Sequence, residues 1–338
     1  MRYLITGGAG FIGSHLAQHL VATGHEVVVL DDLSTGRREN LVPVADRVHL
    51  IVGSVTDPAT CHRAMDGVDC VLHQAAVTSV ERSVREPLAT HGVNVTGTVN
   101  LLLAAGEAGV RRVVFAGSTS AYGNPVDLPN SEDDPTRPLS PYAASKLAAE
   151  QYCQAFHATY GVEPVVLRYF NIFGPRQDPN SQYAAVVPRF ITTALRGERP
   201  TIYGDGGQTR DFVYVANVVH ANVLASRAPA AQVAGQVFNV GCGRSISVTE
   251  LWRCIRELVG VDLEPDYVAG RAGEVRDSLA SIDKARDLIG YQPVVSFEEG
   301  LRQTIAHYQL AGVGRRRTEP RSFLRRAQLL GAANVGVD

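Results

Sequence analysis

The chain has 338 residues, of which 45% are apolar and 20% are charged, and its formal net charge is -2. This composition is that of a folded protein and excludes a disordered chain. The near-neutral charge gives no general attraction to nucleic acid or to an anionic membrane, and no apolar run is long enough to cross a bilayer.

Strands and helices alternate through the first half of the chain. Buried strands are expected at Arg2–Thr6, Glu26–Leu30, Val48–Val52, Cys70–His73, Arg112–Ala116 and Val165–Arg168. Apolar residues at helical spacing predict helices between them, most clearly at Ile12–Thr23, Asn94–Ala108 and Tyr142–Thr159. This alternation predicts an α/β fold with a doubly wound parallel sheet, in a first domain of residues 1–170.

The pattern changes after residue 170. Residues 171–185 are rich in Gly, Pro, Asn and Gln and are expected to form a loop. Residues 211–226 predict a strand and a helix that return to the main sheet, and Ser247–Val259 predicts an amphipathic helix with a Ser/Thr cap. The remaining shorter elements predict a smaller α/β lobe over 171–314, followed by an arginine-rich appendage over 315–338 that we expect to be solvated.

The cysteines and histidines favour neither disulfide nor metal chemistry. The five cysteines are an odd number without a C-x-x-C pair, and the ten histidines show no metal-ligand spacing. The first residues run directly into a motif without a signal-peptide pattern. We therefore expect no metal site and a location in the reducing cytoplasm.

A glycine-rich turn follows the first strand. The sequence GGAGFIG over residues 7–13 fits both G-x-G-x-x-G and G-x-x-G-x-x-G, between a strand and the start of a helix. Glycine permits the tight turn, lets the backbone approach a pyrophosphate and lets the helix pack closely on the strand. The free N–H groups at the start of the helix favour phosphate. In this context the turn predicts a dinucleotide site.

Asp31 ends the second predicted strand, where the residue that holds the adenosine ribose belongs. Its carboxylate would accept hydrogen bonds from a free 2′-hydroxyl and repel a 2′-phosphate. NAD is therefore favoured over NADP, although Arg37 and Arg38 lie nearby and keep NADP open as an alternative.

Ser118, Tyr142 and Lys146 are residue types that together can move a proton from a hydroxyl. Tyr142 and Lys146 are four residues apart in a predicted helix and therefore share a face. A tyrosine with a pKa of about 10 is a poor base at neutral pH, but a nearby ammonium and a positive nicotinamide would favour its phenolate. Only two of the 32 basic residues are lysines, so a lysine at position 146 is stronger evidence for a chemical role of that side chain. Ser118 would position the same substrate hydroxyl.

Together these motifs resemble the extended short-chain dehydrogenases/reductases, in the NAD-dependent nucleotide-sugar epimerase/dehydratase family. The resemblance runs from Met1 to about Leu310, and it includes SxxxYG at 118–123, RYFN at 168–171 and GDG at 204–206, which leads to RD at 210–211. It implies a Rossmann domain that binds NAD. It also implies that Tyr142 is the base, that Lys146 binds the nicotinamide ribose and lowers the Tyr142 pKa, and that Ser118 holds the sugar hydroxyl.

The same resemblance implies residues around each ligand. For NAD these are Gly7, Gly10, Phe11, Ile12, Gly13, Asp31, Asp32, Thr35, Gly36, Ser54, Val55, Ala75, Ala76, Asn94, Tyr142, Lys146 and Tyr169. For a UDP-sugar they are Ser118, Thr119, Ser120, Tyr142, Asn171, Val187, Tyr203, Arg210, Arg271 and Ser278. Asn171, Arg210 and Arg271 are expected at the diphosphate, and Tyr203 against the uracil. Ser54 stands where the family usually has an acidic residue against the adenine.

Several reactions are known in this family. The 4,6-dehydratases carry Asp-Glu directly after the catalytic Ser or Thr, where this chain has Thr119 and Ser120. The UDP-glucuronate 4-epimerases typically have Thr and Arg where this chain has Asn171 and Asp178, and Asp178 would repel a carboxylate if it faced the site. We therefore expect an isomerase that epimerises a UDP-hexose at C4 through a transient 4-keto sugar, with those two reactions as alternatives.

The segment 271–278 resembles the part of the family that limits the size of the sugar's 2-substituent. Ser278 stands where hexose-restricted members have tyrosine, and the smaller side chain leaves volume for an N-acetyl group. Residues 168–185 also resemble the members that act on N-acetylhexosamines. The expected reaction is UDP-GlcNAc/UDP-GalNAc interconversion, with UDP-Glc/UDP-Gal as a second activity.

A non-catalytic NAD-binding scaffold is the alternative outside enzymes. Such a protein would be expected to lose the Tyr142–Lys146 pair, which this chain keeps. Family members are commonly dimers joined by two helices of each subunit. We therefore expect a homodimer through Asn94–Ala108 and Tyr142–Thr159, whose Ala/Leu-rich faces suit close helix packing, and no nucleic-acid or membrane partner.

Overall fold

A seven-stranded parallel sheet lies at the centre of the computed structural model, which describes residues 1–125, 127–179, 185–270 and 275–313. Its strand order is β11-β6-β5-β4-β1-β2-β3, and every neighbouring pair is parallel. The strands are β1 (Arg2–Thr6), β2 (Glu26–Asp31), β3 (Val48–Val52), β4 (Cys70–His73), β5 (Arg112–Ser118), β6 (Glu163–Tyr169) and β11 (Val237–Val240). The sheet confirms the predicted doubly wound α/β class.

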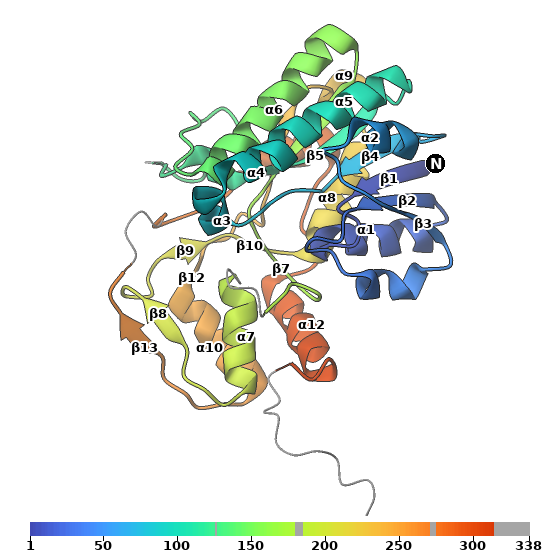
Figure 1. Cartoon of the computed structure of the whole chain (residues 1–338). Coiled ribbons are helices and arrows are strands. Elements are labelled where there is room, and N and C mark those ends of the chain that lie inside the picture. Colours follow the sequence, from blue (N-terminus) through green and yellow to red (C-terminus); the bar gives the residue numbers. More distant parts are fainter. Residues whose placement is uncertain (126, 180–184, 271–274, 314–338) are drawn as a thin grey trace, which may run out of the picture.

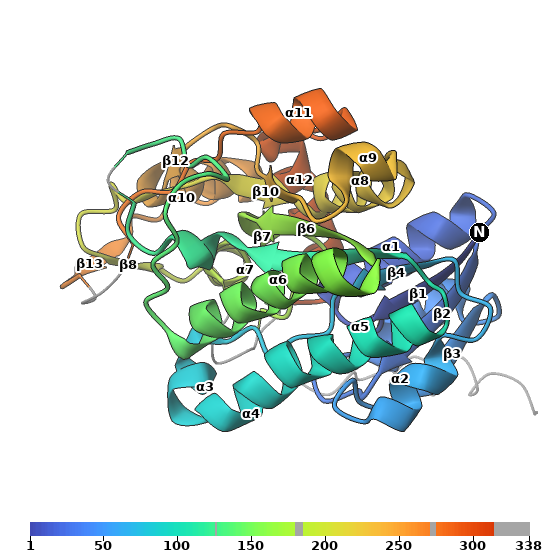
Figure 2. The ribbon, with the colours of Figure 1, turned by 90° about the horizontal axis from the view of Figure 1, so that it is seen from above.

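Helices cover both faces of this sheet (Figure 1, Figure 2). One face carries α1 (Phe11–Ala22) and α8 (Val215–Arg227), and the other carries α2 (Pro58–Ala64), α5 (Gly97–Glu107) and α6 (Pro141–Tyr160). Each interface has its own apolar core, with Leu16 and Val218 in one and Leu101 and Cys153 in the other. Because both faces are covered, β2, β4 and β6 are buried, mostly apolar runs. The edge strand β3 was also expected to be buried, but none of its residues is fully buried, because it has a neighbour on one side only.

Shorter helical segments connect these elements. They are η1 (Arg38–Val44), α3 (Val80–Arg85), α4 (Pro87–His91), η2 (Gly92–Thr96), η3 (Thr119–Tyr122), α9 (Ala230–Val233) and α11 (Asp283–Ile289). The helix expected over Asn94–Ala108 is therefore interrupted, because η2 is a π-helical turn that precedes α5. This turn places the Asn94 side chain against α6, where its Nδ2 donates to Ser145 Oγ.

The second lobe is built from small sheets and three helices (Figure 1). Its strand pairs are β7 (Asn171–Phe173) with β10 (Phe212–Tyr214), β9 (Thr209–Arg210) with β12 (Ile246–Ser247), and β8 (Thr201–Tyr203) with β13 (Asp266–Val268). Its helices are α7 (Val186–Leu195), α10 (Val248–Val259) and α12 (Phe297–Leu310). Phe173, Phe190, Trp252 and Phe297 form the centre of its aromatic core. The predicted cap of α10 is confirmed, since Ser247 accepts a hydrogen bond from the Glu250 N–H.

The path of the chain between the lobes corrects three expectations. Residues 171–173 form β7 rather than loop, and residues 180–184 lie outside the described residues. The strand expected to return to the main sheet, β10, pairs with β7 instead, and only α8 packs on that sheet. The seventh strand of the main sheet is β11, which lies within the range 171–314 expected for the second lobe. Short strands such as these pair according to tertiary contacts that the sequence pattern does not reveal.

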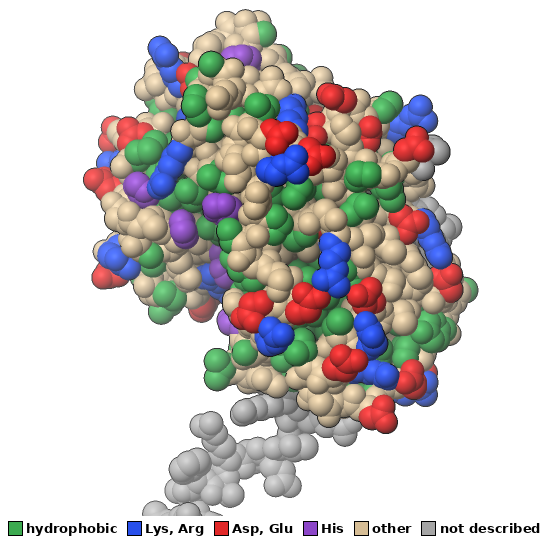
Figure 3. All heavy atoms as spheres, turned by 180° about the vertical axis from the view of Figure 1, so that it is seen from behind, with side chains coloured by type: hydrophobic (Ala, Val, Ile, Leu, Met, Phe, Trp, Pro, Cys, Tyr) green, Lys and Arg blue, Asp and Glu red, His purple; other side chains and the backbone are tan. Residues whose placement is uncertain are grey.

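The surface mixes charges of both signs. Figure 3 shows basic and acidic side chains interspersed over the face opposite to that of Figure 1. Within the described ranges, no helix is long and apolar enough to cross a membrane. The same ranges contain no cluster of three or more His, Cys, Asp or Glu side chains that could hold a metal ion. The five cysteines are unpaired, and the appendage 315–338 lies outside the described residues.

Candidate active site

Two connected cavities lie at the carboxyl ends of the sheet strands, between the sheet and the second lobe. The larger has a volume of about 1440 Å³ and the smaller about 520 Å³. They share lining residues, including Phe11, Ile12 and Gln177, so that a ligand in one would contact a ligand in the other. The carboxyl edge of a doubly wound sheet is where such folds bind ligands.

The larger cavity brings together most of the residues expected at NAD. They are Gly7, Gly10, Phe11, Ile12, Gly13, Asp31, Asp32, Thr35, Gly36, Ser54, Val55, Ala75 and Ala76. The remaining residues expected at NAD, apart from Asn94, line the smaller cavity: Tyr142, Lys146 and Tyr169. The structure therefore places these residues around one continuous space.

The glycine-rich turn has no room for side chains. Gly7 has a φ of +65°, and its N–H donates to the Leu30 carbonyl at 2.8 Å. A Cβ on Gly13 would lie 2.2 Å from the Gly7 carbonyl oxygen. Helix α1 begins after Gly10 without a side-chain cap, so the first N–H groups of the helix are available to a phosphate. This backbone cradle fits the pyrophosphate of a dinucleotide.

Asp31 is held in a fixed orientation at the end of β2. Its Oδ2 accepts from the Ala9 N–H at 2.9 Å and its Oδ1 from the Leu33 N–H at 2.8 Å. Burial raises the pKa of Asp31, while these two hydrogen bonds oppose the shift. A Cβ on Gly36 would approach the Asp31 carboxylate to 2.5 Å, so glycine keeps the space beside it open. The residues present therefore fit the adenosine half of NAD.

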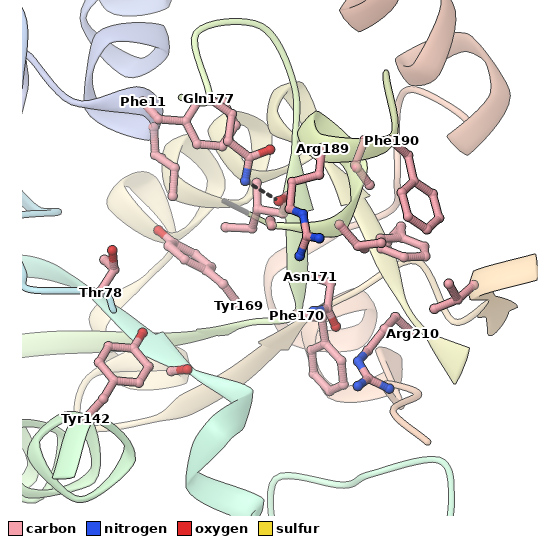
Figure 4. Close-up of a pocket in the computed structure, with 18 of the residues that line it drawn as sticks. Phe11, Thr78, Tyr142, Tyr169, Phe170, Asn171, Gln177, Arg189, Phe190 and Arg210 are labelled. Carbon is pink, nitrogen blue, oxygen red and sulfur yellow. Dashed lines mark hydrogen bonds between the residues drawn. The ribbon is translucent and has the colours of Figure 1, made fainter. Parts of the chain in front are cut away.

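The smaller cavity holds the expected proton-transfer residues, of which Figure 4 labels Tyr142. Ser118 is the last residue of β5, and Tyr142 and Lys146 lie on one face of α6. The Ser140 hydroxyl caps α6 by accepting from the Ala143 N–H at 3.1 Å, and Pro141 is the first helical residue. This start fixes where Tyr142 lies on the helix, and both Tyr142 and Ser118 line the smaller cavity.

The Tyr142 pKa is not lowered by Lys146 in the way that was expected from the sequence. Burial raises the pKa of Tyr142, and the nearby Ser118 hydroxyl only partly opposes the increase. Lys146 Nζ donates to the Ala116 carbonyl at 2.8 Å, and burial lowers the pKa of Lys146 to about 8. The expected lowering of the Tyr142 pKa by Lys146 is therefore not present in the chain alone.

Asn94 lies outside both cavities, although it was expected at NAD. Its Oδ1 accepts from the Val77 N–H at 2.8 Å, and its Nδ2 donates to the Val77 carbonyl at 3.0 Å and to Ser145 Oγ at 2.9 Å. Ser145 in turn donates to the Tyr142 carbonyl at 2.7 Å. Asn94 thus connects the segment after β4 to α6.

The structure places only some of the residues expected at a UDP-sugar in the smaller cavity. Ser118, Tyr142, Asn171, Val187, Tyr203 and Arg210 line the smaller cavity. Thr119, Ser120 and Ser278 line neither cavity: Ser120 Oγ lies 2.8 Å from Ser118 Oγ, and Ser278 is buried. Arg271 lies outside the described residues.

A buried ion pair connects the segments that carry these residues. Arg168 donates to Glu150 through Nη2 at 2.6 Å and through Nε at 3.0 Å. Glu150 lies on the same face of α6 as Lys146, four residues further along, and the Arg168 guanidinium lies 4.7 Å from the Tyr122 ring centroid. The pair therefore links β6, α6 and the turn after Ser118, which explains the Arg168 and Tyr122 positions of the sequence motifs.

Several lining residues were not expected from the sequence. Arg189 and Phe190 come from α7, and Arg176 and Tyr308 line the larger cavity from the second lobe. Helix α7 itself was not predicted, although Val186, Val187, Phe190 and Ile191 follow a helical spacing that could have indicated it.

The fold and site define a protein of the Rossmann type that binds a dinucleotide beside a second ligand. The family model described as "NAD dependent epimerase/dehydratase family" matches residues 3–241. The chain belongs to this family, as its motifs indicate, and its cofactor is NAD.

Individual relatives agree over nearly the whole chain. A UDP-glucose 4-epimerase of Mycolicibacterium smegmatis is 43% identical, over 91% of this chain and 99% of the relative. The UDP-glucose 4-epimerase of Thermotoga maritima with UDP-glucose is 39% identical, with a TM-score of 0.87 over 92% of this chain and 99% of the other. A UDP-N-acetylglucosamine 4-epimerase of Methanobrevibacter ruminantium in complex with UDP-N-acetylmuramic acid is 38% identical, with a TM-score of 0.87 over 92% and 98%.

Proposed function

We propose that this protein is an isomerase that epimerises a UDP-hexose at C4 with NAD. The observation that carries the proposal is the position of Ser118, Tyr142 and Lys146 in a cavity that opens into the dinucleotide-binding cleft. A binding scaffold would have no need for a buried lysine, a tyrosine and a serine at this junction. The family and the named 4-epimerases among the relatives support the same activity.

Tyr142 is proposed to exchange the proton of the sugar 4-hydroxyl. Its phenol oxygen would accept that proton and return it at the end of turnover, while Ser118 Oγ holds the same hydroxyl in place. When bound, NAD supplies reversible oxidation and reduction at C4. Burial raises the pKa of Tyr142 in the chain alone, so the phenolate requires positive charge beside it. Lys146 provides one such charge once its Nζ is within reach of both the ribose and the phenol.

The rest of the cavity is proposed to hold the UDP group. Arg210 and Asn171 would bind the diphosphate, and Tyr203 would contact the uracil. Phe170, Phe190 and Phe212 line the same space and reduce its access to water. A cavity of about 520 Å³ that is lined by both polar and aromatic side chains suits a nucleotide sugar.

For the sugar, we propose UDP-GlcNAc and UDP-GalNAc, with UDP-Glc and UDP-Gal as a second pair. Ser278 and the similarity to a UDP-N-acetylglucosamine 4-epimerase support this choice. Because Ser278 is buried and lines neither cavity, its size would affect the sugar indirectly, through the packing of the residues between Ser278 and the cavity. Asp178 pairs with Arg37 and does not line the sugar cavity, so the case against a hexuronate depends on Asn171 alone.

The deciding experiment incubates purified protein with UDP-Glc, UDP-GlcNAc and UDP-GlcA and assigns product stereochemistry by NMR. We expect inversion at C4 of the two neutral sugars and none for UDP-GlcA. The Tyr142→Phe variant should bind NAD and UDP as the wild type does and should lose turnover by several orders of magnitude. Equal rates for this variant and the wild type would exclude Tyr142 as the base and would reopen the scaffold hypothesis.

The sugar assignment has its own test. Ser278→Tyr should lower the rate with UDP-GlcNAc much more than the rate with UDP-Glc, and the ratio of the two rates corrects for any general loss of folding. An unchanged ratio would show that residues other than Ser278 determine the selectivity for the 2-substituent of the sugar.

Location and assembly are also proposals. The five unpaired cysteines support a reducing compartment such as the cytoplasm. A homodimer through α5 and α6 is supported by their neighbouring positions on one face of the sheet (Figure 2).

A further inference from the structure

The smaller cavity has an uneven distribution of charge. Among its described lining residues are three cationic side chains, Lys146, Arg189 and Arg210, and no aspartate or glutamate. Like charges that share a partly enclosed space repel each other, and the repulsion is stronger than in bulk water. Such an arrangement is favourable only when an anion binds among the cations.

Two of these cations are already engaged by the protein. Lys146 Nζ donates to the Ala116 carbonyl, and Arg210 Nη1 donates to the Thr209 carbonyl at 2.7 Å and to the Arg276 carbonyl at 3.1 Å. Arg189 differs from both. Within the part of the chain that the structure describes, its guanidinium makes no hydrogen bond and no ion pair, and its side chain is exposed.

The position of Arg189 on α7 directs it toward the ligand. Val187 and Phe190 are buried on the same turn and fix the rotation of the helix. Figure 4 shows the Arg189 guanidinium pointing into the cavity above Asn171, while Arg210 approaches from the other side of Asn171. Arg189 also lies in the first turn of α7, where the positive end of the helix dipole makes an additional cation unfavourable unless an anion binds there.

We propose that Arg189 binds the substrate diphosphate from the α7 side of the cavity while Arg210 binds it from the β9 side. This inference rests on the proposed function, because it assumes that the second ligand is a nucleoside diphosphate derivative. A diphosphate presents several oxygens and about two negative charges, and a guanidinium can donate two parallel hydrogen bonds to such oxygens. Two arginines on opposite walls would fix both phosphates and thereby the distance from the uracil to the sugar.

The test compares UDP with uridine, which shares the base and ribose but has no phosphate. UDP binding is measured by calorimetry and uridine binding by NMR titration. Arg189→Gln should weaken UDP binding by roughly ten- to a hundred-fold, since a charge-assisted hydrogen bond is lost, and should leave uridine binding unchanged. Arg196→Gln is the matched control, because Arg196 caps the other end of α7, is exposed and lines neither cavity. It should bind both ligands as the wild type does.

The outcomes separate this inference from the proposed function. Unchanged UDP affinity in Arg189→Gln, or an equal loss for UDP and uridine, would overturn the role of Arg189. Arg189→Lys should keep part of the UDP affinity that Arg189→Gln loses, because lysine keeps the positive charge but cannot donate two parallel hydrogen bonds as a guanidinium does. If the wild type binds UDP through Arg189 and yet inverts no sugar, the inference stands and the 4-epimerase proposal fails.

Discussion

Arg37 and Asp178 form an ion pair across the dinucleotide-binding cleft, with 2.9 Å between Nη2 and Oδ2. Arg37 follows β2 on the NAD side, and Asp178 follows β7 in the second lobe. The two side chains are 59% and 39% exposed, so the pair contributes only about 0–1 kcal/mol to stability. The ion pair also bears on the choice of cofactor. Arg37 is one of the two arginines, with Arg38, that kept NADP open as an alternative, and its guanidinium is paired with a carboxylate.

This pairing leads to a prediction about cofactor choice. Asp31→Ser removes the carboxylate that repels a 2′-phosphate, and adding Asp178→Asn releases Arg37 to bind one. We expect the ratio of NADP to NAD affinity to rise in the single variant and to rise roughly ten-fold further in the double variant. Calorimetric titration of each protein with both cofactors measures the ratio. Asp178→Asn alone should keep its preference for NAD, and a double variant no better than Asp31→Ser would rule out Arg37.

A second prediction concerns the glycine-rich turn. Gly13→Ala would place a Cβ too close to the Gly7 carbonyl oxygen and 2.7 Å from Gly8 Cα. Both neighbours are backbone atoms, which can shift only at a high energetic cost. We expect NAD affinity to fall at least ten-fold and the melting temperature to fall with it. Gly106→Ala is the matched helical control, since its Cβ would meet only Val162 at 3.7 Å. It should keep NAD binding and gain about 0.5–1 kcal/mol of stability.

The same turn shows what the sequence alone could predict. Glycines at positions 7, 10 and 13 between a strand and a helix are typical of a turn that binds a pyrophosphate. This turn and its position at the carboxyl edge of the sheet were therefore predictable. Six of the seven strands of the main sheet were predictable for a similar reason, because burial on both faces favours continuous apolar residues. Local caps such as Ser247 also act over a few residues and are visible in sequence.

Features that depend on distant contacts were not predictable. Arg37 and Asp178 are 141 positions apart, and no local pattern pairs them. Strand β11 comes about 70 residues after β6 in the chain, and the sequence pattern does not show that the two strands pair. Asn94 lies in a π-helical segment, which the sequence does not reveal. The direction in which the Arg189 side chain points depends on how α7 packs on Trp252 through Phe190. In each case tertiary packing decides the outcome.

Lys146 gives a prediction about pH. Burial lowers its pKa from 10.5 to about 8 in the folded chain, so between these values the unfolded chain binds more protons than the folded one. Stability from this group therefore rises with pH across that window, and its unfavourable contribution is largest below pH 8. Lys146→Met removes the titration. We expect the stability of the variant relative to the wild type to decline between pH 7 and pH 10, as measured by urea unfolding without added ligand. A difference that does not change with pH would show that Lys146 is not desolvated.

The last prediction concerns assembly. Helices α5 and α6 lie side by side on the outer face of the sheet, and Tyr152 on α6 is 44% exposed although it is large and mostly apolar. In a dimer formed through these helices, a glutamate at position 152 would place an unpaired charge in the interface. We expect the wild type to be a dimer by light scattering at micromolar concentration and Tyr152→Glu to dissociate at least ten-fold more readily. Tyr267→Glu is the matched control, since Tyr267 is 52% exposed on β13 in the second lobe, and it should remain dimeric. A monomeric wild type, or equal dissociation of both variants, would exclude α5 and α6 as the interface.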